Sequence, residues 1–71
     1  MNKETLEYLI YLIHACSHKW GVSPARVYHR LNTCSCIDDY LVRHYEVLHA
    51  LGTEYLVKDL EAYVEKWGNA K

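Results

Sequence analysis

Residues 3–24 of the chain read KETLEYLIYLIHACSHKWGVSP, and this stretch contains the clearest signals of secondary structure. Its apolar side chains recur at spacings of three and four residues, which is the period of a helix with one apolar face. They are Leu6, Leu9, Ile10, Ile13, Cys16 and Trp20, and the face is widened by Tyr8, Tyr11 and Leu12. Gly21 suits a left-handed cap at the helix end, and Ser23-Pro24 suits the start of another helix. The stretch therefore predicts a helix over residues 3–19, a tight turn and a second helix.

The same period continues through the rest of the chain and predicts an all-α fold. The apolar stripe of the second helix, Val27, Tyr28 and Leu31, gives it the range 24–32. Two further stripes predict helices over residues 37–51 and 54–67, with Gly52 as a cap between them. No segment alternates at period two for long enough to form a strand. We therefore expect a small bundle of four short helices.

Polar residues between the stripes predict where the later helices begin. Ser35 with Asp38 resembles a capping box for the third helix, although the usual residue at the second position is glutamate. Thr53 is placed to cap the fourth helix. The segment 33–36 between the second and third helices is expected to be a loop.

The length and composition bound the function. A chain of 71 residues with 51% hydrophobic residues makes one folded domain over residues 1–71, with little room for a deep substrate cavity. It has seven tyrosines and two tryptophans, more large rings than so small a core can cover. We therefore expect a non-enzymatic module whose exposed apolar surface binds a partner protein or a second copy. The candidate contact residues are Tyr8, Tyr11, Tyr45 and Tyr55.

A nucleic-acid-binding regulator is the alternative. The formal net charge is −1, which argues against a general polyanion binder, yet no acidic residue lies between His14 and Ile37. Segment 14–32 resembles a helix-turn-helix, whose second helix enters the major groove. In this alternative the contacts to nucleic acid come from Arg26, His29 and Arg30.

The cysteines and the N-terminus indicate a compartment. Three cysteines are an odd number for a secreted disulfide framework, and the start of the chain has an acid where a signal peptide has basic residues. The longest apolar run, 8–13, is too short to span a membrane. We expect a cytoplasmic protein with reduced thiols and no membrane association.

A metal site is a weak alternative. His14 and His18 are four residues apart on a helix, and Cys34 and Cys36 supply two thiols, so a Cys2His2 set can be written down. The Cys-x-Cys spacing lacks the two-residue spacer of most zinc knuckles, and no residues have the arrangement of a catalytic nucleophile or a phosphate loop. We expect no metal, no cofactor and no catalytic residue.

Three segments of the second half resemble an uncharacterised family of short bacterial domains. They are Ile37-Asp38-Asp39-Tyr40-Leu41, Tyr45-Glu46-Val47-Leu48-His49 and Glu54-Tyr55-Leu56-Val57-Lys58-Asp59-Leu60, and the Tyr-Glu-x-Leu-His element is the specific part. The resemblance covers roughly residues 8–65. It implies a small helical accessory protein of an antitoxin-like kind, and it carries over no catalytic residue. The loop with Cys34 and Cys36 departs from the family pattern.

The Tyr-Glu-x-Leu-His element has a structural interpretation. Tyr45 and His49 fall on one helical face, and His49 lies near the helix end, where its ring can bond free carbonyl groups. Asp59 is placed to accept a hydrogen bond from His49 or Tyr45 across the short turn. We therefore expect Tyr45, His49 and Asp59 to lock the third and fourth helices together.

Overall fold

A computed structural model of the chain describes residues 2–68, and these residues form helices and no strand. The all-α prediction is confirmed. The α-helices are α1 (Lys3–Trp20), α2 (Pro24–Thr33), α3 (Tyr45–Leu48) and α4 (Thr53–Tyr63). Two π-helical segments accompany them, η1 (Ile37–Val42) and η2 (Val64–Gly68), and η2 continues directly from α4.

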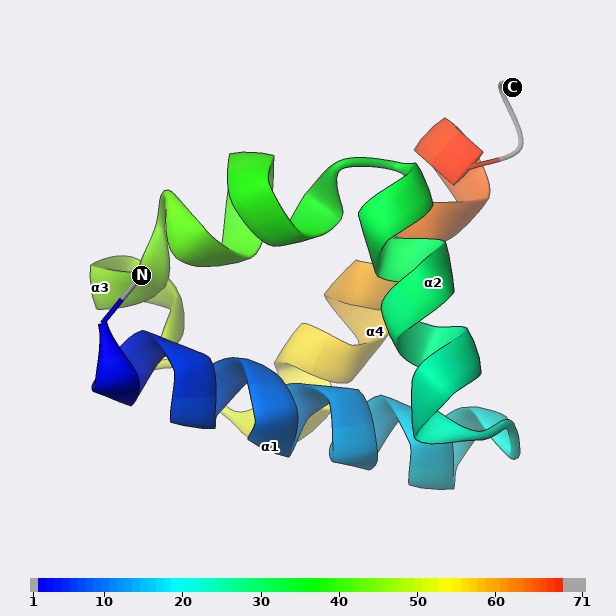
Figure 1. The fold of residues 1–71 in the computed structure, drawn as a ribbon, viewed down its shortest axis with the longest axis horizontal. Helices are drawn as coiled ribbons and strands as arrows, with labels where there is room; N and C mark the ends of the chain where they lie inside the picture. The colour runs from blue at the N-terminus through cyan, green and yellow to red at the C-terminus, as the bar shows by residue number, and fades with distance from the viewer. Residues whose placement is uncertain (1, 69–71) are drawn as a thin grey trace.

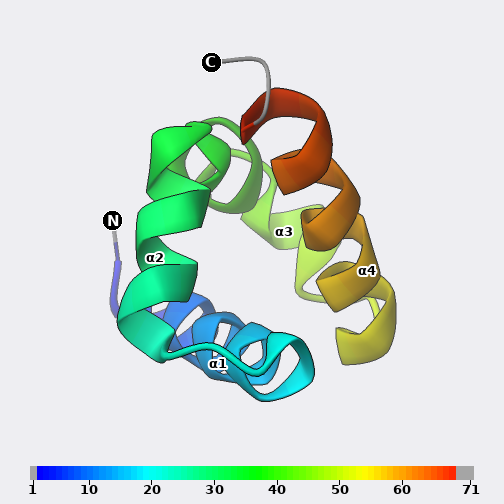
Figure 2. The same cartoon turned by 90° about the vertical axis from the view of Figure 1, so that its right-hand side faces the viewer.

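The helices enclose one core (Figures 1 and 2). Helices α2 and α4 contact α1 from opposite sides, as the view along α1 in Figure 2 shows. The chain from η1 to α3 then runs back across the molecule towards the N-terminal end of α1 (Figure 1). Because α2 stands over the C-terminal half of α1, the N-terminal half is left with fewer neighbours.

Helix α1 forms where the sequence predicts it, but its buried face is rotated. Leu9 and Cys16 are buried as expected, and they are joined by Thr5 and Leu12. Leu6 and Ile10, which the predicted stripe placed inside, are 49% and 48% exposed. They lie one turn apart in the N-terminal half of α1, which α2 does not cover, so part of the predicted core face is a surface.

The turn between α1 and α2 follows the prediction. Gly21 has φ 68°, the left-handed conformation that a glycine adopts cheaply at a helix end, and its amide donates to the carbonyl of Ser17. The Ser23 hydroxyl accepts from the amide of Arg26 at 3.3 Å, which caps α2, and Pro24 is the first helical residue. At the other end of α1, Asn2 supplies a cap that the sequence reading missed.

The core is built mainly from α1, α2, η1 and α4. Its fully buried side chains are Leu12, Cys16, Val27, Leu31, Cys36, Leu41, Leu56 and Leu60. Val27 and Leu31 of α2 are buried as predicted, but Tyr28 is half exposed. The two cysteines of the predicted loop, Cys34 and Cys36, are buried side chains of this core. The side chain of Trp67, which the predicted fourth stripe contains, lies outside the described residues.

The predicted helix over residues 37–51 is wrong as a single helix. Residues 37–42 are π-helical, Arg43 and His44 form a turn, and α3 is only four residues long. His44 has φ −110° and ψ 23°, which takes the backbone out of the helical region. Because of this break, the side chain of Tyr45 points towards α1, where its ring contacts the ring of Tyr8. Tertiary packing has therefore overridden a continuous helical period.

Three predicted caps are also corrected. Gly52 has φ −68° and ψ 147°, an extended conformation, so it precedes α4 as its N-cap and does not end a helix in the left-handed region. Thr53 is the first residue of α4, and its hydroxyl pairs with Tyr11 instead of capping. No side chain caps the start of η1, so the Ser35–Asp38 capping box does not form, and Ser35 itself has φ 60°.

Within residues 2–68, none of the helices combines the length and apolar character needed to cross a bilayer.

Candidate functional site

Three of the four predicted contact tyrosines come together with a histidine in what we call the tyrosine cluster: Tyr8, Tyr11, Tyr45 and His49. Tyr8 meets Tyr45 edge to face, with ring centroids 5.4 Å apart, and Tyr45 stacks on His49 at 4.7 Å. Tyr11 lies one turn after Tyr8 on α1, and its hydroxyl is 2.7 Å from the hydroxyl of Thr53. The cluster therefore joins α1 to α3 and to the start of α4.

Exposed apolar side chains belong to the same elements as this cluster. Among the described residues, the structure exposes seven large hydrophobic side chains, and five of them lie on α1, on α3 or just before α4: Leu6, Ile10, Tyr11, Val47 and Leu51. Val47, at 67%, is the most exposed of them. We call these five residues and the tyrosine cluster together the α1–α3 surface.

The α1–α3 surface is hollowed at one end. A depression of about 510 Å³ lies between the start of α1 and the chain from Val42 to Val47. Asn2 and Thr5 line it from α1, and Tyr45 and Val47 line it from α3. The break at Arg43–His44 creates this depression, because it turns α3 against the N-terminal end of α1. Sequence reasoning missed Leu6, Ile10 and Val47 as surface residues, since helical period alone cannot tell which face is covered.

Tyr55, the fourth predicted contact residue, is exposed but belongs to another group. It lies near Tyr40 of η1, whose hydroxyl donates to the carboxylate of Asp59. The Tyr40 ring also stacks on Tyr63 at 5.3 Å. Burial raises the pKa of Tyr40, and the bond to Asp59 raises this pKa further.

The hydrogen bonds of Tyr45, His49 and Asp59 differ from those of the predicted lock. His49 bonds the carbonyl of Tyr45 through Nδ1 at 2.8 Å, as a histidine near a helix end is expected to do. Asp59, however, accepts its hydrogen bond from Tyr40 and not from Tyr45 or His49. The reason is the break in the predicted third helix, which directs Tyr40 towards α4 and Tyr45 towards α1.

The hydroxyl of Tyr8 is buried without a hydrogen-bond partner. Burial, followed by the neighbouring Tyr45 and Tyr11, raises the pKa of this phenol. An unsatisfied buried hydroxyl costs the folded state its desolvation energy. Tyr8→Phe keeps the ring contact with Tyr45 and should stabilise the domain by about 1 kcal/mol. Thermal unfolding should then shift upward by roughly 4–8 °C. A lower melting temperature would mean that this hydroxyl has a stabilising partner.

The three cysteines are free thiols in the core. Burial raises the pKa of Cys16 to about 11, and the nearby Glu61 adds to this rise. Burial and the adjacent Cys34 thiol raise the pKa of Cys36 as well. A thiol with a raised pKa stays protonated at neutral pH, which makes it a poor nucleophile and a poor metal ligand. The Cys16 and Cys36 thiols therefore serve packing in this arrangement.

The weak Cys2His2 alternative is not assembled. Cys34 and Cys36 are buried, whereas His14 and His18 are exposed on α1, and His14 bonds the carbonyl of Ile10 at 2.9 Å. Residues 2–68 contain no group of three or more histidine, cysteine or acidic side chains placed to hold a metal ion.

The raised thiol pKa values predict a loss of stability in alkali. The unfolded chain deprotonates Cys16 near its ordinary pKa of 9.0, whereas the folded chain holds the proton to about 11. Above pH 9 the unfolded state therefore binds fewer protons, and the free energy of unfolding falls as pH rises, by up to about 1.4 kcal/mol per pH unit for this thiol. Urea unfolding in a reductant between about pH 8 and 11 measures it.

A matched variant isolates the contribution of this thiol. Cys16→Ala should be less stable at every pH, but its stability should fall less steeply between about pH 9 and 11. Equal slopes in the two proteins would contradict the assignment to Cys16.

The residues of the nucleic-acid alternative lie on α2. Arg26, His29 and Arg30 are all exposed, and α2 follows α1 across the Gly21 turn. Arg30, however, also lines a cleft with two glutamates, Glu61 and Glu65. Carboxylates beside it repel a phosphate backbone, so this position is a poor one for a phosphate contact.

Comparison with known proteins places the chain in a family. No curated protein and no solved structure matches it. The sequence profile of DUF3791, described as a protein of unknown function, matches residues 7–67. This range includes the tyrosine cluster and all the buried hydrophobic side chains of the core. The chain therefore belongs to the DUF3791 family of proteins of unknown function.

Proposed function

We propose that the protein is a non-enzymatic interaction module that binds another protein through its α1–α3 surface. The observation that carries the proposal is the exposure of large apolar side chains, which lies between 41% and 67% for the five on this surface. Large apolar patches on a domain surface mark interaction sites, and exposed apolar side chains gathered on neighbouring elements favour such a site.

The chemistry of the α1–α3 surface supports a protein as the partner. Tyrosine is enriched among the residues that dominate protein–protein binding energies, and Tyr11 offers half of its side chain to solvent. The hollow beside Val47 offers a recess for an apolar side chain of the partner. The partner is either a second copy of this chain or a different protein, and an accessory role in a bacterial, cytoplasmic complex fits both.

The test uses two variants matched in exposure. Ile10→Glu places a charge within the α1–α3 surface, and Tyr28→Glu places one on α2, where the native side chain is 50% exposed. Neither change enters the core, so both variants should fold. We expect sedimentation of the purified chain, or of the native complex, to show an assembly that Ile10→Glu dissociates at least about tenfold more readily and Tyr28→Glu leaves intact.

Two outcomes would overturn the proposal. The first is a chain that stays monomeric at about 1 mM and purifies from its native cells without a stoichiometric protein. The second is binding to DNA or RNA in a gel shift that weakens steeply with salt, together with loss of binding in Arg26→Gln. That result would favour the nucleic-acid alternative.

A further inference from the structure

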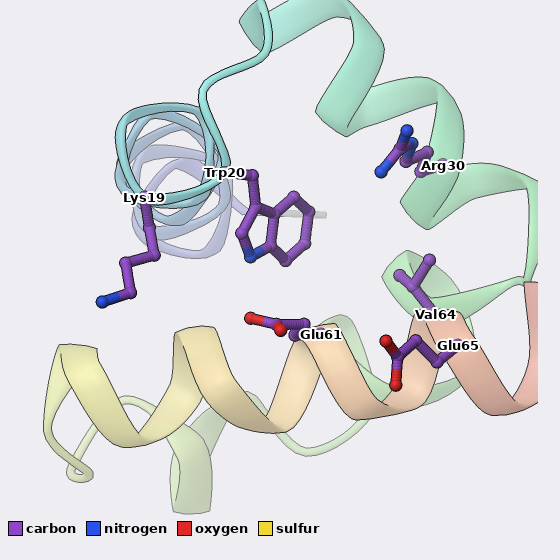
Figure 3. A pocket seen from close by; sticks show the side chains of 6 residues that line it. All are labelled: Lys19, Trp20, Arg30, Glu61, Val64 and Glu65. Carbon is purple, nitrogen blue, oxygen red and sulfur yellow. The ribbon is translucent and has the colours of Figure 1, made fainter.

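A cleft outside the α1–α3 surface lies where three helices meet. It has a volume of about 450 Å³ and is lined by six residues: Lys19, Trp20, Arg30, Glu61, Val64 and Glu65 (Figure 3). Lys19 and Trp20 end α1, Arg30 extends from α2, and the other three belong to α4 and η2. This volume lies in the range of small-molecule sites.

The charges of the cleft are balanced and unpaired. Two cations, Lys19 and Arg30, and two carboxylates, Glu61 and Glu65, line the cleft from different helices, and the Trp20 ring lies between the two cations (Figure 3). None of the four forms an ion pair with another residue of the described part of the chain. A space therefore separates the opposite charges, and a ligand bearing one charge of each sign can pair with both sets.

Trp20 adds an unsatisfied hydrogen-bond donor to the cleft. Its indole nitrogen is buried and donates to no acceptor among the described residues, and it points towards the side of the cleft that carries Glu61 (Figure 3). A buried N–H group without an acceptor costs free energy, and its place beside the cleft makes its signal a reporter of a ligand bound there. The indole ring and Val64 provide apolar surface beside it.

We propose that this cleft binds a free α-amino acid with an apolar side chain. Its carboxylate accepts from the Arg30 guanidinium, whose planar fork matches a carboxylate. Its ammonium group donates to Glu61 and Glu65, and its side chain rests on Val64 and the indole ring. A nucleotide does not fit, because the two glutamates repel its phosphates. The cleft lies apart from the α1–α3 surface, so this proposal does not depend on the proposed function.

Nuclear magnetic resonance of the indole N–H group provides the test. The signal of Trp20 is assigned by its absence in Trp20→Phe. L-leucine or L-phenylalanine should shift it in a saturable way with a dissociation constant of about 1 mM. N-acetyl-leucine lacks the ammonium charge and leucine amide lacks the carboxylate, so each should bind at least about tenfold more weakly.

Two variants and one control check the assigned contacts. Arg30→Gln and Glu61→Gln should each weaken leucine binding about tenfold, whereas Arg26→Gln, on the same helix but outside the cleft, should leave it unchanged. The proposal fails if neither amino acid produces a saturable shift up to about 20 mM. It also fails if the two analogues bind as well as leucine, or if all three variants bind equally.

Discussion

Leu12→Ala should lower the free energy of unfolding by about 3 kcal/mol. Leu12 is completely buried in the middle of α1, where α2, α4 and η1 all contact the helix. Removing most of its side chain leaves a cavity that rigid neighbouring helices fill only in part. A 71-residue domain has only about 5 kcal/mol of stability to lose, so this variant should keep about 2 kcal/mol and unfold at a much lower urea concentration. Urea unfolding followed by circular dichroism measures the change.

Leu6→Ala is the matched control for this prediction. It makes the same chemical change on the same helix, at a position that is 49% exposed. We expect a loss below about 1 kcal/mol. Equal losses in Leu6→Ala and Leu12→Ala would contradict the rotated register of α1 and would restore the stripe predicted from the sequence.

Tyr40→Phe should lower the free energy of unfolding by about 2 kcal/mol, the second largest effect expected of a substitution. The change removes the hydroxyl that donates to Asp59 and leaves a half-buried carboxylate without this donor. Hydrogen bonds to charged groups are worth more than neutral ones, and the stacking of the ring on Tyr63 is retained. Thermal unfolding of the purified variant measures the loss.

The contrast with Tyr8→Phe makes the Tyr40 prediction specific. Both substitutions delete one phenolic oxygen, yet the expected effects have opposite signs, because one hydroxyl has a partner and the other has none. Asp59→Asn should lie between native protein and Tyr40→Phe, since the amide oxygen still accepts but carries no charge. Loss of stability in Tyr8→Phe and none in Tyr40→Phe would contradict the two assignments together.

Much of the fold could be predicted from local signals. The stripe in residues 3–19, the left-handed Gly21 and the Ser23-Pro24 start each report on one or two turns of chain, and they fixed α1 and α2 to within a residue or two. The break at Arg43–His44 could not be predicted, because residues 37–51 contain no glycine or proline to mark it. It arises from contacts between segments distant in sequence, such as Tyr8 with Tyr45.

The sequence predicted that aromatic rings would be exposed, but it did not predict which tyrosines would gather on one surface. The surplus of tyrosine predicted exposed aromatic rings, and Tyr11 and Tyr55 are indeed exposed. Which tyrosines gather depends on where the chain breaks and on which face of α1 is covered, and both are set by tertiary packing. The burial of Cys34 and Cys36 escaped prediction for the same reason, since a short turn between helices looks the same in sequence whether it faces the core or water.

Site-specific photo-crosslinking tests directly whether a protein binds the α1–α3 surface. A photoreactive amino acid replaces Ile10 on the α1–α3 surface or, in the control, Tyr28 on α2, since the two side chains are about equally exposed. Irradiation in the native cells, followed by mass spectrometry, identifies what each position touches. We expect position 10 to form a covalent adduct with one protein, either this chain or a single other species, and position 28 to form none. Equal labelling at both positions, or adducts with nucleic acid at position 28 and none with protein at position 10, would contradict this expectation.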